Sequence, residues 1–226
     1  MGKEENSWLN RYMHFSFANY YNGAHIHFGA LRVLNDNTVQ PGAGFDTHPH
    51  DDMEVLSYVV YGTLSHADSM GNKTTLTRGQ MQYISAGTGL LHSEYNWEDE
   101  PLCFLQIWFY PDKQSYPPRY QMHPFLWEER INQWLPLVTG ENNVLDAAPI
   151  RIHTDVNIFA NVLEAGRKQD FAVGRGKQAY IVCIEGEAHV KDIVLHEHDA
   201  LKVVEENISF ETDKGAHLLA IEMPIA

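Results

Sequence analysis

Hydrophobic side chains along this chain are concentrated in short runs instead of long periodic stretches. The runs are rich in β-branched and aromatic residues, and turn sequences such as residues 69–72 (SMGN) and 185–187 (EGE) separate them. This texture predicts β-strands joined by tight turns. The clearest predicted strands are residues 55–61, 81–84, 103–110, 179–184, 201–204 and 217–222. The fold class is therefore predicted to be all-β, a sandwich or a barrel.

Helical periodicity is scarce. The best helical candidate is residues 126–135 (LWEERINQWL), whose apolar positions lie roughly along one stripe of a short helix. Residues 136–150, with a polar run at 139–143 (TGENN), indicate a polar connector, after which a second β-rich stretch begins. We therefore expect two tandem β-domains, one over residues 1–135 and one over residues 136–226.

Two short segments each place a pair of metal-ligating side chains two residues apart: His48 with His50, and His92 with Glu94. Residues i and i+2 of a strand project from the same face, so two such strands facing each other would form a His3Glu metal site. This donor set, without thiolate, suits Fe(II), Mn(II), Ni(II), Co(II) or Cu(II) better than a structural zinc closed by cysteines. Four protein ligands on a metal that accepts six leave room for substrate or O2, which predicts a catalytic site. A chain with 13 histidines also contains such pairs by chance, so the spacing alone leaves a structural or solvated role open.

Composition and charge limit the expected binding partners and the cellular compartment. The chain has 16 basic and 30 acidic residues, a formal net charge of -14, and no run of Lys or Arg, which disfavours direct binding to nucleic acid. No apolar stretch approaches membrane-spanning length, and the first residues lack the apolar core of a signal peptide. Cys103 and Cys183 each lie in an apolar run, so we expect buried thiols in a reducing, cytoplasmic setting.

Six segments, taken in order along the first half of the chain, indicate a protein family more specifically than the histidine spacing does. They are HFSFANYY (14–21), GALRVLND (29–36), GFDTHPHDDMEVLSYVVYG (44–62), HADSMGN (66–72), GQMQYISAGTGLLHSEYN (79–96) and LQIWFYP (105–111). Over residues 14–125 they closely resemble the N-terminal half of pirin-family proteins, among them the bacterial quercetin 2,3-dioxygenases. The resemblance implies a bicupin of the cupin superfamily, with two jelly-roll β-barrels in tandem and a metal site in the N-terminal barrel only. It places the family's metal ligands on His48, His50, His92 and Glu94, with Fe(II) favoured and Mn, Ni, Co, Cu or Zn as alternatives.

The resemblance also implies an activity, the cleavage of flavonols such as quercetin by O2 with release of carbon monoxide. The 3-hydroxyl of the flavonol would bind the metal as it loses its proton, and Glu94 is the nearest available base. Candidates to line an apolar slot around this flat substrate are Phe45, Met81, Tyr83, Phe104 and Trp108. Two alternatives stay open: a redox-sensing regulatory protein that binds a metal and a protein partner without turnover, and another metal-dependent reaction on an unknown small molecule.

Two acidic residues near the first histidine pair bear on this assignment. Glu54 is a rival ligand, because strict strand alternation would place it on the same face as His50, whereas the resemblance gives the carboxylate to Glu94. Glu54 would then either hydrogen-bond the metal ligands or have a structural role. Asp51 departs from bacterial relatives, which tend to carry a basic residue directly after the HPH sequence. Its negative charge should help to hold a dication and should oppose an anionic flavonol.

Two further groups imitate the ligand spacing. His66 and Asp68 lead into the predicted turn, where an Asp side chain commonly bonds nearby backbone, so a turn-stabilising role is predicted. Residues 196–198 (HEH) run directly into another acidic residue and have no HxE partner downstream. We expect them on the solvated surface.

Overall fold

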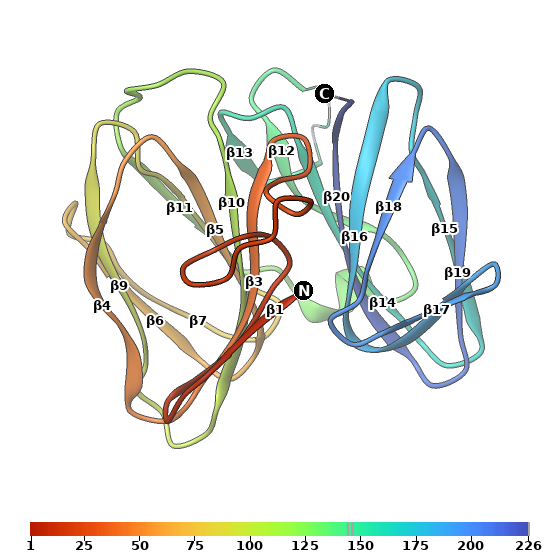
Figure 1. The fold of residues 1–226 in the computed structure, drawn as a ribbon, viewed down its shortest axis with the longest axis horizontal. Coiled ribbons are helices and arrows are strands. Elements are labelled where there is room, and N and C mark those ends of the chain that lie inside the picture. Colours follow the sequence, from red (N-terminus) through yellow and green to blue (C-terminus); the bar gives the residue numbers. More distant parts are fainter. Residues whose placement is uncertain (144, 146, 226) are drawn as a thin grey trace. The chain divides into compact units, whose positions relative to one another are not determined.

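The computed structural model describes residues 1–143, 145 and 147–225, and Figure 1 traces its ribbon. Across these residues the regular elements are β-strands, apart from one short 3-10 helix, η1 (Trp127–Arg130), so the all-β prediction is confirmed. Two compact units are present: Met1–Phe125 with Ile152–Thr154, and Leu126–Arg151 with Asp155–Ala226. The packing thus divides the chain at residue 125, whereas the sequence predicted a division at residue 135.

The first unit is built from two antiparallel sheets. The larger has the strand order β1-β2-β3-β10-β5-β8-β11, and the smaller has the order β4-β9-β6-β7. Their bounds are β1 Gly2–Glu5, β2 Leu9–Met13, β3 Leu31–Val39, β4 Ala43–His50, β5 Glu54–Tyr61, β6 Leu64–Asp68, β7 Lys73–Leu76, β8 Met81–Ser85, β9 Leu90–Asn96, β10 Leu102–Phe109 and β11 Arg119–His123. Side chains of both sheets pack into shared clusters, as in a jelly-roll barrel.

The interior of this barrel is layered. One apolar cluster contains Leu9, Val39, Val59, Leu64, Leu76, Leu102 and Phe104. A second contains Val55, Ile84 and Leu90. Along β10 the residues on this inner face are Phe104, Gln106 and Trp108, and along β5 they are Val59, Ser57 and Val55, so that a polar side chain separates the two clusters on each strand. We call the buried side chains at this level the polar layer: Asn35, Ser57, Gln82, Glu94 and Gln106.

The second unit contains a sheet with the order β13-β12-β14-β20-β16-β19-β15, to which β17 and β18 are added through β16. The bounds are β12 Leu135–Gly140, β13 Ile150–Ile152, β14 Asn157–Leu163, β15 Arg167–Ala172, β16 Lys177–Val190, β17 Ile193–His196, β18 Ala200–Val204, β19 Asn207–Thr212 and β20 Ala216–Pro224. The turn expected at residues 185–187 is instead part of β16, directly after a bulge between Cys183 and Glu185. Gly186 there has a φ of +78°, and a Cβ would lie 2.2 Å from the carbonyl oxygen of Gly215.

The helix predicted over residues 126–135 was wrong beyond its first turn. Asn132 adopts a φ of +53°, which ends any helix, and its backbone N–H bonds the Val162 carbonyl at 2.8 Å. The following Leu135 already begins β12, which pairs with β14. The predicted connector over residues 136–150 was therefore also wrong at its start, because residues 136–140 belong to a strand.

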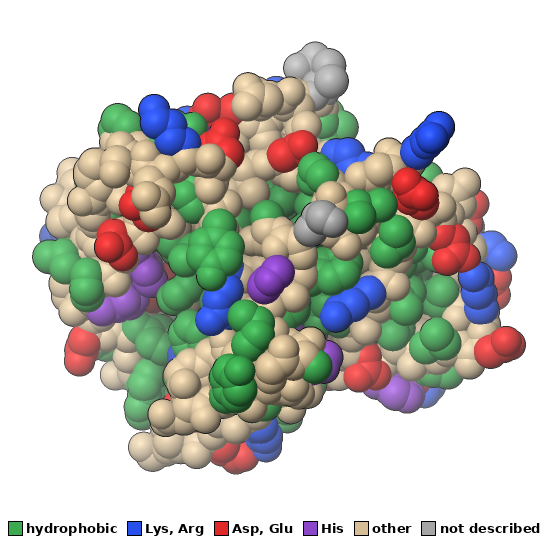
Figure 2. Space-filling model, turned by 45° about the horizontal axis from the view of Figure 1, so that its top comes forward, with side chains coloured by type: hydrophobic (Ala, Val, Ile, Leu, Met, Phe, Trp, Pro, Cys, Tyr) green, Lys and Arg blue, Asp and Glu red, His purple; other side chains and the backbone are tan. Residues whose placement is uncertain are grey.

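The surface carries both signs of charge. On the face drawn in Figure 2, Lys and Arg side chains are interspersed with Asp and Glu side chains. Both cysteines, Cys103 and Cys183, are buried thiols, as predicted. No helix in the described part of the chain is long and apolar enough to cross a membrane.

Candidate metal centre

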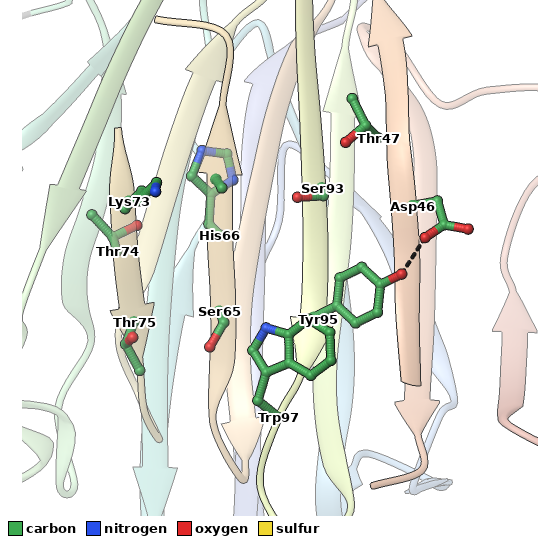
Figure 3. Close-up of a pocket in the computed structure, with 11 residues that line it drawn as sticks. Asp46, Thr47, Ser65, His66, Lys73, Thr74, Thr75, Ser93, Tyr95 and Trp97 are labelled. Atoms are coloured by element: carbon green, nitrogen blue, oxygen red, sulfur yellow. Dashed lines mark hydrogen bonds between the residues drawn. The ribbon is translucent and has the colours of Figure 1, made fainter. Parts of the chain in front are cut away.

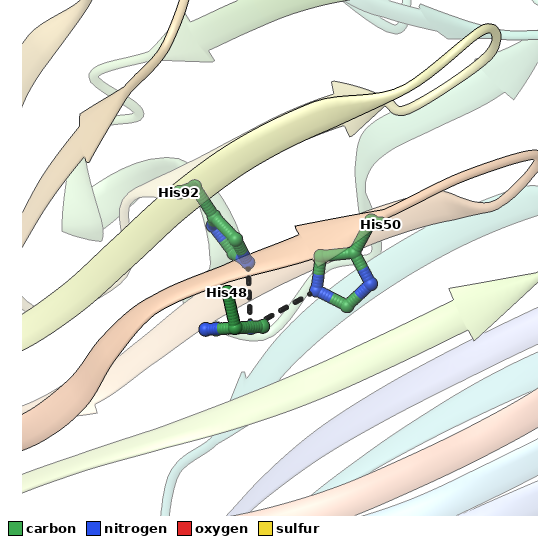
Figure 4. Close-up of side chains that lie close together, drawn as sticks. All are labelled: His48, His50 and His92. Carbon is green, nitrogen blue, oxygen red and sulfur yellow. Dashed lines mark hydrogen bonds between the residues drawn. The ribbon is translucent and has the colours of Figure 1, made fainter.

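Three histidine side chains converge in the first unit. His48 and His50 lie on β4, and His92 lies on the neighbouring β9, where it pairs directly with His48. The Nε2 atom of His48 is 3.2 Å from Nε2 of His50 and 3.1 Å from Nε2 of His92 (Figure 4). Among the described residues, these three form the one group of potential ligands close enough to share a metal ion. The period-two spacing brings His48 and His50 together, and the pairing of β4 with β9 adds His92.

The His48 ring presents a lone pair to the other two histidines. Nδ1 of His48 lies 2.7 Å from the backbone carbonyl of Asp46, so Nδ1 carries the hydrogen and Nε2 the lone pair. Burial, followed by the charges of His48 and His66, lowers the pKa of His92 to about 3. Burial, followed by the charges of the other two histidines, lowers the pKa of His50 to about 4. Both rings are therefore neutral at physiological pH, which is the form that binds metals.

The spacing of the three nitrogens fits one metal ion. With metal–nitrogen bonds of about 2.1 Å, ligands at adjacent corners of an octahedron lie about 3.0 Å apart, close to the separations observed. Hydrogen bonds among the rings cannot replace such an ion fully, because each neutral ring has one N–H and His48 uses its own on Asp46. The donor set therefore suits a divalent transition metal.

Glu94 lies two residues after His92 on β9 but is not part of the converging group. Its Oε1 accepts hydrogen bonds from Ser57 Oγ at 2.5 Å and Gln82 Nε2 at 2.9 Å. Its Oε2 accepts one from Gln106 Nε2 at 2.5 Å. A carboxylate offers about four acceptor positions, so these three bonds leave one, on Oε2, for a metal or a proton. The role of Glu94 as fourth ligand stays a prediction.

The rival carboxylate, Glu54, belongs to a different network. The chain turns between β4 and β5, where Asp52 has a φ of +42°, so strand alternation does not continue from one strand to the other. Glu54 consequently lies on the face of β5 that turns away from the polar layer. Its Oε2 accepts hydrogen bonds from the Tyr83 hydroxyl at 2.5 Å and from the His153 backbone N–H at 2.8 Å. The expected shared face with the histidines was wrong.

Replacing Glu54 with Gln should therefore change metal affinity by less than about 10-fold, because the side chain contacts none of the three histidines. It should lower the free energy of unfolding by about 1–2 kcal/mol, since an amide oxygen accepts more weakly than a carboxylate from Tyr83 and His153. Competition with a chelator measures the first quantity and urea unfolding the second. A loss of metal affinity near 100-fold would show that Glu54 acts on the site.

His66 and Asp68 stabilise the turn after β6, as predicted. Oδ1 of Asp68 accepts from the backbone N–H groups of Met70 at 2.9 Å and Asn72 at 3.0 Å. Burial raises the pKa of Asp68, but the hydrogen bonds from Asn72 and His66 outweigh it and hold the pKa below its usual value. His66 stacks on Tyr120 with ring centroids 4.9 Å apart.

The HEH sequence of the second unit lies on β17 and the following turn. The side chain of His196 is 66% exposed and its Nδ1 lies 3.6 Å from a carboxylate oxygen of Glu187. Glu197 is 57% exposed. His196 and Glu197 are on the solvated surface, as expected, whereas the side chain of His198 is only 23% exposed.

The five candidates for an apolar slot separate into two sets. Phe45 and Phe104 contact each other edge to face inside the barrel, with ring centroids 6.3 Å apart. Trp108 also faces inward, and its ring centroid lies 4.9 Å from that of His50. Met81 and Tyr83 lie on the opposite face of β8, beside the carboxylate network described above. The structure therefore brings three of the five to the side of the histidines.

Sequence reasoning missed the residues that hold Glu94. Ser57, Gln82 and Gln106 are each a polar side chain with apolar or aromatic neighbours on both sides in its strand, and each is at most 7% exposed. Such isolated polar positions were the available signal, because a buried polar group needs a buried partner. What the sequence did not show is that three of them converge on one carboxylate.

An open pocket of about 530 Å³ adjoins the histidines. It is lined by Pro49, His50, Asp51, Ser69, Gly89, Leu90 and Leu91. Its volume is in the range of small-molecule sites, and its lining includes a candidate metal ligand. The pocket therefore offers a route from solvent to His50, with the exposed carboxylate of Asp51 at its wall.

A second groove, of about 370 Å³, lies on the smaller sheet of the first unit (Figure 3). It is lined by Asp46, Thr47, Ser65, His66, Ala67, Lys73, Thr74, Thr75, Ser93, Tyr95 and Trp97. The rings of Tyr95 and Trp97 stack with centroids 4.3 Å apart, and the Tyr95 hydroxyl bonds Asp46. Ser93 and Tyr95 alternate with His92 and Glu94 along β9, so this groove opens on the strand face away from the metal centre.

Known proteins resemble this chain over nearly its whole length. Residues 1–109 match the Pirin family and residues 137–223 match the quercetinase C-terminal cupin domain. A quercetin 2,3-dioxygenase of Escherichia coli K12 is 35% identical over 229 residues, covering 99% of this chain and 95% of that protein. A pirin-like protein of Caulobacter vibrioides is 36% identical over 208 residues, covering 92% and 89%. The crystal structure of the bacterial pirin YhhW from Escherichia coli in complex with nickel(II) matches with a TM-score of 0.90 at 32% identity, covering 100% of this chain and 96% of that one.

Proposed function

The chain belongs to the pirin family, and on that premise we propose that it is a metal-dependent dioxygenase that cleaves flavonols such as quercetin with O2 and releases carbon monoxide. The observation that carries the proposal is the convergence of three histidines in a barrel, with the buried carboxylate of Glu94 on the next inward position of β9. The name of the similar Escherichia coli protein supports the same reaction.

We assign one divalent metal ion to His48, His50 and His92, with Glu94 as the fourth ligand and Fe(II) as the favoured metal. The nickel(II) complex of the Escherichia coli pirin supports a divalent ion. When bound, the metal supplies Lewis acidity that favours the anionic form of the flavonol 3-hydroxyl, together with the redox chemistry that O2 requires.

Glu94 is proposed to act as the base. The O–H bond of the 3-hydroxyl breaks, its electron pair stays on the flavonol oxygen, and the proton moves to Oε2 once that oxygen has shifted away from the metal, because only one acceptor position remains there. The bonds from Ser57, Gln82 and Gln106 hold the carboxylate in one orientation, so Oε2 is positioned before substrate arrives. The proton is returned to the ring-opened depside after O2 has added and carbon monoxide has left.

The test is aerobic consumption of quercetin by protein stripped of metal and reloaded separately with Fe(II), Mn(II), Ni(II), Co(II), Cu(II) or Zn(II). Absorbance follows the flavonol, and carbon monoxide is measured in the headspace. Metal-dependent loss of flavonol with about one equivalent of carbon monoxide is the expected result. Stoichiometric metal binding without turnover for any metal would contradict the proposal and would favour the regulatory alternative with a protein partner.

Asp51 should weaken the binding of an anionic flavonol, because its carboxylate lines the pocket beside His50. Replacing Asp51 with Lys should lower KM for quercetin by about 3- to 10-fold at low salt, and added salt should reduce the gain. Asp213→Lys, at an exposed position of the second unit, is the control for total charge and should leave KM unchanged. If the Asp51→Lys enzyme has the wild-type KM at low salt, the charge of Asp51 does not affect substrate binding.

A further inference from the structure

The polar layer contains an amide that the protein itself does not satisfy. Asn35 is 1% exposed, and neither its Oδ1 nor its Nδ2 has a hydrogen-bond partner among the described residues. The great majority of buried polar groups in folded proteins are paired, because leaving one unpaired is costly. An amide with both groups unpaired is therefore available to bond a ligand that is not part of this chain.

Asn35 lies next to the residues that hold Glu94. On β3 it pairs directly with Gln106 of β10, and Gln106 donates to Oε2 of Glu94 at 2.5 Å. Odd-numbered residues of β3 face the barrel interior, since Val39 belongs to the inner apolar cluster. The Asn35 amide thus lies one strand beyond Gln106, the residue that bonds the proposed base.

Trp108 supplies a second unpaired group on the same side. It follows Gln106 by two residues, so both project from the inner face of β10. Its indole Nε1 is buried and has no partner in the part of the chain that the structure describes, while its ring lies 4.9 Å from that of His50. An unpaired donor beside the histidines and an unpaired amide beyond Gln106 therefore flank the base.

We propose that Asn35 is a specificity-determining residue that binds a peripheral hydroxyl of a planar polyphenol, and that Trp108 donates its indole N–H to the oxygens at the reacting ring. A carboxamide both donates and accepts, as a phenolic hydroxyl does, whereas an indole only donates and so suits a carbonyl or phenolate oxygen. The substrate class is then a flavonol that carries hydroxyls besides the one at position 3. This inference rests on the proposed function.

Such a site discriminates strongly. A pocket built to bond a hydroxyl disfavours the analogue that lacks it, because the protein groups are then left unpaired. Quercetin should bind about 10- to 100-fold more tightly than 3-hydroxyflavone, which keeps the 3-hydroxyl and the carbonyl but has no other hydroxyl. Leucine has the same branched shape and the same number of side-chain heavy atoms as asparagine, so Asn35→Leu removes the hydrogen-bonding groups while it keeps the outline of the side chain.

The experiment measures dissociation constants of both flavonols by fluorescence quenching, with the full chain loaded with Zn(II) so that turnover does not interfere. In Asn35→Leu, quercetin should bind about 10- to 100-fold more weakly and 3-hydroxyflavone as in wild type. The midpoint of thermal unfolding without ligand should rise by about 2–4 °C, because an unpaired buried group has been removed. Trp108→Phe should weaken both ligands by a similar factor.

Asn161→Leu is the matched control. Asn161 is 0% exposed in β14 of the second unit, and both of its amide atoms are likewise unpaired. Its replacement should raise the unfolding midpoint while leaving both dissociation constants unchanged. Should Asn35→Leu fail to fold, Asn35→Ala must show the same loss of preference for quercetin.

Two outcomes overturn the inference in distinguishable ways. If wild-type protein binds both flavonols equally, or if Asn35→Leu is more stable with both dissociation constants unchanged, Asn35 does not select substrate although the proposed function stands. If zinc-loaded wild-type protein binds neither flavonol, while it holds the metal, the proposed function fails and this inference fails with it.

Discussion

Replacing His48 with Ala should abolish metal loading at concentrations that saturate the wild-type protein, and flavonol cleavage with it. His48 is the ring that the other two histidines share, with its Nε2 3.2 Å from His50 and 3.1 Å from His92. Four-ligand structural zinc sites are worth about 10–16 kcal/mol, or roughly 3 kcal/mol for each ligand, so the loss of one ligand should cost at least about 100-fold in affinity. Metal content after gel filtration and competition with a chelator measure the change.

The fold should survive this substitution, because His48 is only partly buried and its neighbours on β4 remain paired with β9. The metal-dependent rise in the unfolding midpoint should disappear, while the midpoint of the metal-free protein should stay close to that of wild type. His196→Ala, in the HEH sequence of the second unit, should leave metal content and activity unchanged. Full metal loading of His48→Ala would show that the metal lies elsewhere.

Glu94→Gln should lower kcat by about 10²- to 10⁴-fold at saturating metal, because the amide cannot take the proton of the flavonol. The new NH2 group would also face the donors of Gln82 and Gln106, so the side chain loses part of its hydrogen bonding. Metal affinity should fall as well, by about 10- to 100-fold if the carboxylate is a ligand. Steady-state kinetics over a range of metal concentrations separates the two effects.

Glu54→Gln is the matched control for this substitution. Both glutamates are 1% exposed and both accept hydrogen bonds from buried donors, so the chemical change and the burial are the same. Only the surroundings differ, since Glu54 bonds Tyr83 and His153 instead of the polar layer. An equal fall of kcat in the two variants would show that the loss reflects buried charge in general and not a base at Glu94.

The part of the site that sequence predicted best depends on local strand geometry. His48 and His50 project together because they are two residues apart on one strand, and no tertiary contact is needed to know this. The pairing of β4 with β9, which adds His92, is tertiary, and the resemblance to a known family supplied it. The hydroxyl and amide partners of Glu94 come from three different strands, so their convergence could not be read from spacing.

The failed expectations share a physical cause. The alternation that was to carry Glu54 to the histidines is broken by the positive φ of Asp52, and the predicted helix is ended by the positive φ of Asn132. Residues other than glycine rarely adopt this conformation, and when they do the tertiary structure imposes it. Met81 was expected beside the histidines because it is apolar. Apolar residues occupy both faces of β8, so only the tertiary packing shows which face Met81 lies on.

The tripeptide Ile152–Thr154 limits how this chain can be divided into independent halves. It belongs by packing to the first unit although 26 residues of the second precede it, and it delivers the backbone N–H of His153 to the buried carboxylate of Glu54. A gene fragment ending at residue 135 would leave that carboxylate buried without this donor. Exchange of halves between relatives, in the laboratory or by recombination during evolution, should therefore succeed only when the tripeptide and Glu54 come from compatible parents.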